Sequence, residues 1–175
     1  MRKLLFHSLF GGPATEKPPA PGDAELAELG RALERAAGRR LGRSLSMRAV
    51  DAGSCNGCEL ELHALNNAYY DVERFGIRFV ASPRHADVLL VTGPVTRRMR
   101  DPLLTAYQSM PEPRLVAALG DCALGCGLLG SPDELVGPVD ALLPVDLRIP
   151  GCPPTPEGIA TALLELVDCA RTTSR

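Results

Sequence analysis

The sequence is poor in aromatic residues and carries no strong excess of either charge. Only 4% of its 175 residues are aromatic and tryptophan is absent, so the stacking platforms that hold single-stranded nucleic acid are not expected. The formal net charge is −2 at pH 7, whereas nucleic-acid-binding domains usually carry a strongly basic face. These two absences exclude nucleic acid as an expected partner.

Long apolar runs and activated catalytic groups are missing as well. A transmembrane helix needs roughly 20 consecutive apolar residues, and no stretch of the sequence approaches that length. The apolar segment 1–10 imitates a signal peptide, but His7 and Ser8 interrupt it and no small-residue cleavage site follows. We therefore expect a cytoplasmic protein with reduced thiols. No acid–base pair or activated nucleophile is visible, so we assign no catalytic residue and expect no catalysis from the isolated chain.

Turn-forming residues are abundant, with 17 glycines and 16 prolines. Residues 1–22 join the apolar segment to a proline-rich connector that cannot continue a helix, and we expect an extended N-terminal docking arm there; a disordered terminus is the alternative. Residues 23–175 show no internal repeat and no composition break. A chain of this size can bury roughly two-thirds of its unfolded surface, so we expect one domain over this range.

Strand and helix patterns alternate along this expected domain. Helical spacing of leucine and alanine predicts a first helix at 23–40. We expect strands at 47–51, 77–80, 87–92, 114–119 and 145–149, and further helices at 58–70, 102–110 and 157–170. The unbroken apolar run 88–91 is typical of a parallel sheet covered on both faces. The alternation therefore predicts a three-layer α/β fold of the doubly wound type.

Four of the six cysteines follow expected strands. Cys55 and Cys58 come after the first strand, Cys122 after the strand at 114–119, and Cys152 after the last strand. The carboxyl ends of parallel strands meet at one edge of a sheet, so we expect these four side chains to meet there. Each lies in a turn with glycine or proline, whose backbone can approach a bulky inorganic group and donate hydrogen bonds to it.

This set of thiols is compatible with either an iron–sulfur cluster or zinc, and buried or disulfide-bonded cysteines are a third interpretation. Structural zinc more often uses two C-x-x-C pairs, and this chain has one. A 4Fe–4S cluster spreads its iron corners over a larger volume, which suits ligands from separate loops. A thioredoxin-like redox pair would leave two turn cysteines unexplained. The spacing favours iron–sulfur, with zinc as the main alternative.

Five stretches occur in the order and spacing of one protein family. They are residues 51–62 (DAGSCNGCELEL), 74–77 (RFGI), 81–96 (ASPRHADVLLVTGPVT), 120–123 (GDCA) and 149–156 (IPGCPPTP). In these stretches the sequence resembles the small electron-transfer subunit shared by respiratory complex I and the energy-converting, membrane-bound nickel–iron hydrogenases of the formate hydrogenlyase type. The resemblance implies a flavodoxin-like domain with one 4Fe–4S cluster on Cys55, Cys58, Cys122 and Cys152.

The resemblance also implies partners. They are a large subunit with a nickel–iron centre or a quinone pocket, a ferredoxin-like iron–sulfur subunit, and membrane-embedded subunits that hold the protein at the cytoplasmic side of the membrane. Two residues separate Cys55 from Cys58, whereas complex I subunits usually have adjacent cysteines here, and the chain stops after one domain, without the extra clusters of uptake hydrogenases. We therefore expect a hydrogenase-type subunit, with the quinone-reducing complex I-like subunit as the alternative.

Residues near the cysteines are candidates for tuning the cluster. Glu61 matches the acidic position of the family. The resemblance also supports Arg84 as a donor of hydrogen bonds near the cluster. The alternative for Glu59 and Glu61 is a solvated first helical turn, and for Arg84 surface packing. Cys126 follows Cys122 by four residues, but the family pattern places the ligand at Cys122, so we expect Cys126 to be a local thiol.

Overall fold

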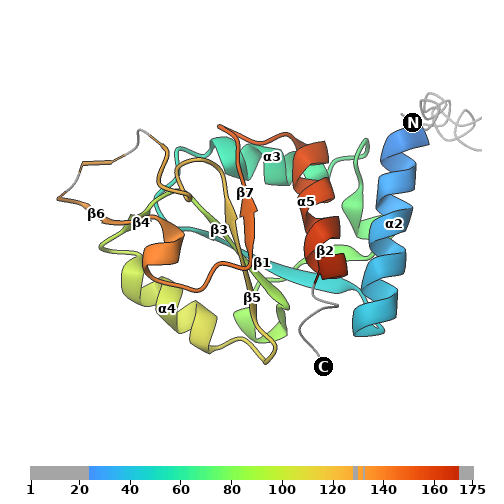
Figure 1. Ribbon diagram of the computed structural model, residues 1–175, viewed down its shortest axis with the longest axis horizontal. Coiled ribbons are helices and arrows are strands. Elements are labelled where there is room, and N and C mark those ends of the chain that lie inside the picture. The colour runs from blue at the N-terminus through green and yellow to red at the C-terminus, as the bar shows by residue number, and fades with distance from the viewer. Residues whose placement is uncertain (1–23, 128–129, 132, 170–175) are drawn as a thin grey trace, which may run out of the picture.

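A five-stranded parallel sheet forms the centre of the protein (Figure 1). The structure is a computed structural model, and it describes residues 24–127, 130–131 and 133–169. The predicted arm 1–22 lies outside the described residues. The strands are β1 (Leu45–Asp51), β2 (Ile77–Phe79), β3 (Val88–Thr92), β5 (Leu115–Leu119) and β7 (Leu147–Ile149). Their order is β2-β1-β3-β5-β7, so the chain reverses its direction of travel across the sheet between β1 and β3. This is the flavodoxin-like strand order, and ligands bind at such a switch point.

Helices cover both faces of the sheet, which confirms the predicted three-layer α/β fold. The helices are α2 (Ala24–Leu41), α3 (Gly57–Leu65), α4 (Arg100–Gln108) and α5 (Pro156–Cys169), with short 3-10 turns η1 (Val72–Phe75), η2 (Pro83–His85) and η3 (Val139–Ala141). One face packs against α2, α3 and α5, and the other against α4 and η3. In Figure 1, α2 and α5 lie side by side, with α4 on the opposite side of the sheet.

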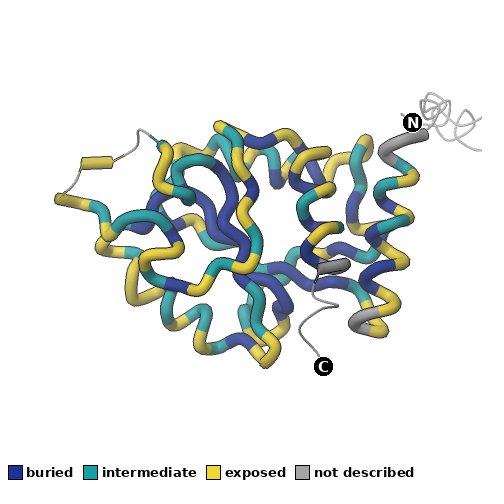
Figure 2. The backbone as a smooth tube through the Cα atoms, viewed as in Figure 1, coloured by how far each residue is buried: buried dark blue, intermediate teal, exposed yellow. Residues whose placement is uncertain are grey.

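The central strand β3 shows why an unbroken apolar run forms here. Val88 and Leu90 contribute to the core beneath α2 and α5, whereas Leu89 and Val91 contribute to the core beneath α4, and all four are fully buried. Successive side chains of a strand point to opposite faces, so a strand covered on both sides needs apolar residues at every position. Burying each such side chain stabilises the fold by about 1.5–3 kcal/mol. Figure 2 shows the buried strands running through the middle of the protein.

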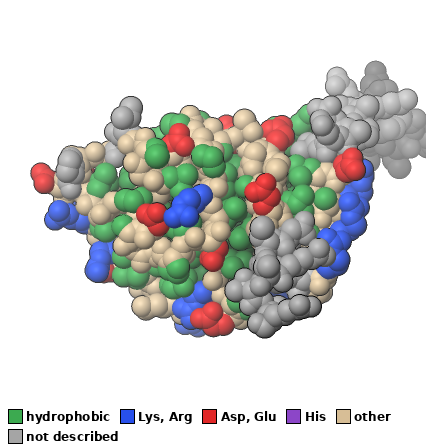
Figure 3. Space-filling model, in the orientation of Figure 1, with side chains coloured by type: hydrophobic (Ala, Val, Ile, Leu, Met, Phe, Trp, Pro, Cys, Tyr) green, Lys and Arg blue, Asp and Glu red, His purple; other side chains and the backbone are tan. Residues whose placement is uncertain are grey.

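Helix α2 is amphipathic and lies at one end of the sheet. Leu33, Ala36 and Ala37 are buried, and the helix packs on α5 and η1. At Gly30 an added Cβ atom would lie 2.3 Å from the ring of Phe75, so glycine allows the close approach of α2 and η1. The outer face is charged, and Figure 3 shows basic side chains along the edge of the molecule over α2. The exposed charged residues of this face are Glu28, Arg31, Glu34, Arg35 and Arg39.

One prediction about local structure was wrong, and one pair of short strands was not predicted. The helix predicted at 58–70 ends at Leu65, because the Asn67 side chain accepts hydrogen bonds from the backbone N–H groups of Tyr69 (2.8 Å) and Tyr70 (3.0 Å). Such a turn competes with helical hydrogen bonds. The small antiparallel pair β4 (Val95–Thr96) and β6 (Leu135–Gly137) was not predicted, because strands of two and three residues are too short for a visible alternation.

Asp87 joins three strands at the amino-terminal edge of the sheet. It precedes β3, is 8% exposed, and its carboxylate accepts hydrogen bonds from Arg43 at 2.6 and 3.0 Å. The same carboxylate accepts the backbone N–H of Ser46 in β1 at 2.9 Å. Its backbone N–H donates to Ser46 O (2.7 Å), and its carbonyl accepts from the N–H of Leu115 in β5 (3.1 Å). One residue thus fixes the register of β1, β3 and β5.

The Asp87→Ala substitution should lower the free energy of unfolding by about 2 kcal/mol, because the buried N–H of Ser46 loses its acceptor. Urea unfolding of the full chain measures the change. Asp101→Ala is the matched control: that side chain is 82% exposed and pairs with Arg100 at 3.0 Å. It should change the stability by less than about 1 kcal/mol. Equal losses in both variants would contradict the role given to Asp87.

Candidate metal centre

Four loops at the carboxyl-terminal edge of the sheet, three of which carry cysteines, surround a cavity of about 130 Å³. Figure 1 shows α3, which begins in one of these loops, at the edge toward which β7 points. The cavity is lined by the four cysteines predicted from the sequence, Cys55, Cys58, Cys122 and Cys152, and by residues of the same loops and of the β3 loop: Ser54, Gly57, Gly93, Asp121, Gly151 and Pro153. The structure therefore brings together the four side chains that the sequence placed after three strands.

The loop after β1 is held by the last residue of that strand. The Asp51 carboxylate accepts hydrogen bonds from the backbone N–H groups of Gly53 (2.8 Å) and Ser54 (2.7 Å). Asn56 adopts the left-handed conformation (φ 72°), which asparagine tolerates better than most residues. Helix α3 then begins at Gly57, so Cys58 lies in its first turn. The first N–H groups of a helix lack intrahelical acceptors and favour negative charge nearby.

The Cys122 and Cys152 loops are hydrogen-bonded to each other. Asp121 accepts the backbone N–H of Gly151 through its carboxylate at 2.8 Å, and its own N–H donates to Gly151 O at 2.8 Å. The N–H of Gly120 donates to Ile149 O, also at 2.8 Å. Because these bonds join the residues that flank both cysteines, the two loops keep a fixed relative position.

Two glycines allow the close contacts at this site. Gly120 has φ +88°, and a Cβ atom added there would lie 2.6 Å from Cys58 Sγ. Gly93 has φ +71°, and an added Cβ atom would lie 2.4 Å from the backbone nitrogen of Ser54. The first glycine leaves room for a sulfur atom, and the second lets the β3 loop touch the Cys55 loop through backbone alone.

Negative charge accumulates around Cys58. Burial raises the pKa of its thiol to about 11, with further contributions from the negative charges of Glu59 and of Cys55, Cys122 and Cys152. The same interactions place the three other cavity cysteines near the Cys58 sulfur, in agreement with the lining of the cavity. In the described part of the chain, no three His, Cys, Asp or Glu side chains are arranged to hold one metal ion.

Glu59 is joined to two hydroxyl groups beside the cysteine loops. Ser54 Oγ donates to Glu59 Oε2 at 2.5 Å, and Thr92 Oγ1 donates to Glu59 Oε1. The sequence drew attention to Glu59 but indicated no partner for it. Thr92, Gly93 and Asp121 were not singled out, although each stands at the end of a strand or within two residues after it, where site residues of this fold gather.

The other candidates lie away from the cavity. Glu61 is half-buried on α3, and Arg84 is exposed in η2, where its backbone N–H donates to Ser82 Oγ (3.4 Å). Neither lines the cavity, and their predicted influence on the cluster stays a prediction. Cys126 is exposed and does not line the cavity either.

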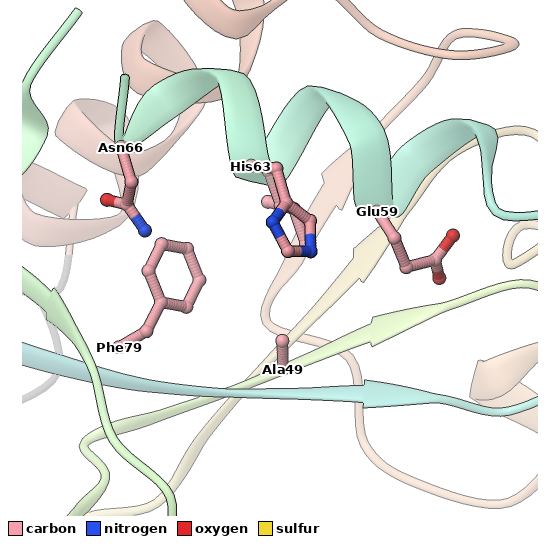
Figure 4. A pocket seen from close by; sticks show the side chains of 6 residues that line it. Ala49, Glu59, His63, Asn66 and Phe79 are labelled. Atoms are coloured by element: carbon pink, nitrogen blue, oxygen red, sulfur yellow. The ribbon is translucent and has the colours of Figure 1, made fainter. Parts of the chain in front are cut away.

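A second hollow of about 240 Å³ lies between α3 and the strands β1 and β2 (Figure 4). Glu59, His63 and Asn66 descend from one face of α3 toward Ala49 and Phe79, and Leu62 completes the lining. In this view the Glu59 carboxylate points along α3 away from His63. Glu59 therefore separates this hollow from the cysteine loops.

The fold and site define a class: a flavodoxin-like α/β protein whose strand-end loops gather four cysteines around one cavity. The family model of the NADH ubiquinone oxidoreductase 20 kDa subunit matches residues 55–166. This chain belongs to that family, as its resemblance in sequence predicted. Family members are subunits of oxidoreductases.

Named relatives come from two kinds of complex. Formate hydrogenlyase subunit 7 of Escherichia coli (strain K12) is 47% identical over 129 residues, which cover 71% of this chain and 51% of that protein. The chain thus spans about half the length of this relative. An NADH-quinone oxidoreductase subunit of Citrifermentans bemidjiense is 45% identical over 111 residues, covering 63% of this chain and 65% of that protein.

A solved structure agrees with the fold. A chain of the membrane-bound sulfane sulfur reductase, an archaeal respiratory membrane complex, superposes with a TM-score of 0.67 and 31% identity, covering 81% of this chain and 77% of that chain. None of the helices within the described residues combines the length and the apolar character that crossing a membrane requires.

The Gly120→Ala substitution should displace the Cys58 sulfur and reduce the metal content of the purified protein to a small fraction of the wild-type value. The added Cβ atom would collide with Cys58 Sγ and would also strain a positive φ. Metal analysis by plasma mass spectrometry measures the effect. Gly38→Ala, on the exposed face of α2 where an added Cβ atom meets nothing within 4 Å, should keep the wild-type content. A Gly120→Ala protein with full metal content would refute this account of the cavity.

Proposed function

We propose that this chain is an electron-transfer subunit that holds one 4Fe–4S cluster on Cys55, Cys58, Cys122 and Cys152, beside the catalytic large subunit of a membrane-bound nickel–iron hydrogenase-like complex. The observation that carries the proposal is the convergence of four cysteines from three loops on one cavity. The similarity to formate hydrogenlyase subunit 7 supports the choice of complex.

The residues present fit such a cluster better than zinc. Four thiols are the usual ligand set of a 4Fe–4S cluster. The four thiols come from separate loops and line a cavity of about 130 Å³, which suits a group whose iron corners are spread over several ångströms. Gly120 keeps space free beside Cys58, and the amino terminus of α3 offers N–H groups that favour the negative charge of a thiolate-bound cluster.

The bound cluster supplies one-electron transfer, and the chain supplies position and insulation. The reciprocal hydrogen bonds of Asp121 and Gly151 fix two of the ligand loops, and the Asp51 carboxylate fixes the third. Cys58 and Cys122 are half-buried, whereas Cys55 and Cys152 are exposed. The site therefore opens to the surface, where the large subunit would cover it and keep the electron path short and dry.

The second candidate is the equivalent subunit of a quinone-reducing, complex I-like NADH dehydrogenase. The 45% identity to the NADH-quinone oxidoreductase subunit of Citrifermentans bemidjiense favours it. The feature that separates the two candidates is the spacing of Cys55 and Cys58, which here have two residues between them. In both candidates the complex would also include a ferredoxin-like iron–sulfur subunit and membrane-embedded subunits, which would hold the chain at the cytoplasmic side of the membrane.

Replacing any one of Cys55, Cys58, Cys122 and Cys152 by serine should remove or degrade the cluster, because an alkoxide is a much poorer iron ligand than a thiolate. Iron and sulfide analysis and low-temperature electron paramagnetic resonance of the reduced protein measure the loss. Cys126→Ser is the matched control and should keep both iron and spectrum, since Cys126 does not line the cavity. Loss of the cluster with Cys126→Ser but not with Cys122→Ser would reverse the ligand assignment.

The choice between the two complexes predicts a difference in metal content. In the hydrogenase-like complex the large subunit must supply the thiolates for nickel, because the four cavity cysteines are committed to the cluster. The intact complex should then contain nickel, oxidise hydrogen or reduce protons, and its large subunit should carry two C-x-x-C pairs. A nickel-free complex that passes electrons to a quinone would establish the second candidate instead.

A further inference from the structure

The Glu59 carboxylate lies behind the cysteine cavity and joins two elements that form its wall. It accepts a hydrogen bond from Ser54 Oγ at 2.5 Å and one from Thr92 Oγ1. Ser54 directly precedes Cys55, and Glu59 directly follows Cys58. The hydrogen bond between Ser54 and Glu59 therefore joins the residue before Cys55 to the residue after Cys58.

Resting on the function proposed above, we propose that Glu59 is a positioning residue that fixes the C-x-x-C loop on the end of β3 and holds the reduction potential of the cluster down through its charge. The inference goes beyond the ligand set, because it assigns a role to a residue that does not line the cavity.

The positioning role follows from the surroundings of the two hydroxyl groups. Thr92 is the last residue of β3 and is 1% exposed, so its side chain is held in place by the core. Ser54 Oγ also accepts the backbone N–H of Asn56 at 3.0 Å, which connects the hydroxyl to the turn between the two cysteines. Glu59 thus ties the loop to β3 through side chains, next to the backbone contact that Gly93 makes with Ser54.

The electrostatic role follows from the position of the charge. Reduction adds one electron, and hence one negative charge, to the cluster, and a neighbouring carboxylate opposes this addition. Glu59 directly follows Cys58, and its carboxylate is held by Ser54, the residue before Cys55, so the charge is fixed beside the C-x-x-C pair. The hydroxyl groups of Ser54 and Thr92 donate into the carboxylate and offset part of its charge.

The same helix carries a second carboxylate, Glu61, that the hydrogen bonds of Ser54 and Thr92 do not reach. Glu61 is two residues further along α3, about 200° around the helix axis, and so points from a different face. Glu59 shares its face with His63 and Asn66, as Figure 4 shows. A Glu→Gln change at either position removes one charge from the same helix, but only the change at Glu59 alters the hydrogen bonds to Ser54 and Thr92.

The test is a redox titration of the complex purified anaerobically with the full chain, followed by low-temperature electron paramagnetic resonance. The signal of this cluster is identified by its loss in Cys152→Ser. Glu59→Gln should keep the iron and raise the midpoint potential. The equilibrium constant for reduction should increase about tenfold, which corresponds to about 59 mV for a one-electron couple. Thr92→Val should shift the potential the other way, because the carboxylate loses a donor and keeps its charge. Glu61→Gln removes a charge from the same helix without altering these hydrogen bonds, and its shift measures the separate predicted influence of Glu61.

The outcomes separate this inference from the function on which it rests. A wild-type complex with no cluster signal would overturn the proposed function and this inference together. A wild-type signal whose potential is unchanged by Glu59→Gln, or unchanged by Thr92→Val, would overturn the role of Glu59 alone. If Glu59→Gln fails to retain iron, Thr92→Val decides: a lowered potential supports the inference, and an unchanged one overturns it.

Discussion

Four sulfur atoms around one small cavity repel one another as thiolates, and the loops that carry them contain almost no regular structure. Their positions therefore depend on the parallel sheet beneath them. Parallel pairing brings the ends of β1, β3, β5 and β7 to one edge, and helices on both faces hold those strands in register. The sheet places the loops, and hydrogen bonds between the loops set their positions relative to one another.

Aspartate side chains make the connections at both edges of this sheet. At the carboxyl-terminal edge, Asp51 and Asp121 accept backbone N–H groups of the cysteine loops. At the amino-terminal edge, Asp87 accepts the N–H of Ser46, and Asp146 accepts the N–H of Val116 at 2.8 Å. A carboxylate can take several such bonds, so one short side chain satisfies backbone donors where strand pairing begins or ends.

The sequence predicted the sheet and the meeting of the four cysteines, because both depend on strong local patterns. A buried parallel strand must be apolar at every position, as 88–91 is, and a cysteine directly after such a strand must lie at the ligand-binding edge. The contact between Glu59 and Thr92 could not be predicted, because it joins residues 33 positions apart through the pairing of β1 with β3. Glu61 was chosen from the family resemblance, which does not show which carboxylate a neighbouring strand contacts. The end of α3 depended on the Asn67 side chain, whose competition with the helix is not visible in hydrophobic spacing.

The network around Asp87 and the cysteine cavity lie at opposite ends of β3, a strand of five residues that spans about 16 Å. At such a distance the free-energy effects of substitutions are usually additive. Selection for thermal tolerance can therefore act on the amino-terminal edge while selection for redox behaviour acts on the other. An engineer can use the same separation, strengthening the protein at one end of the strand without retuning the chemistry at the other.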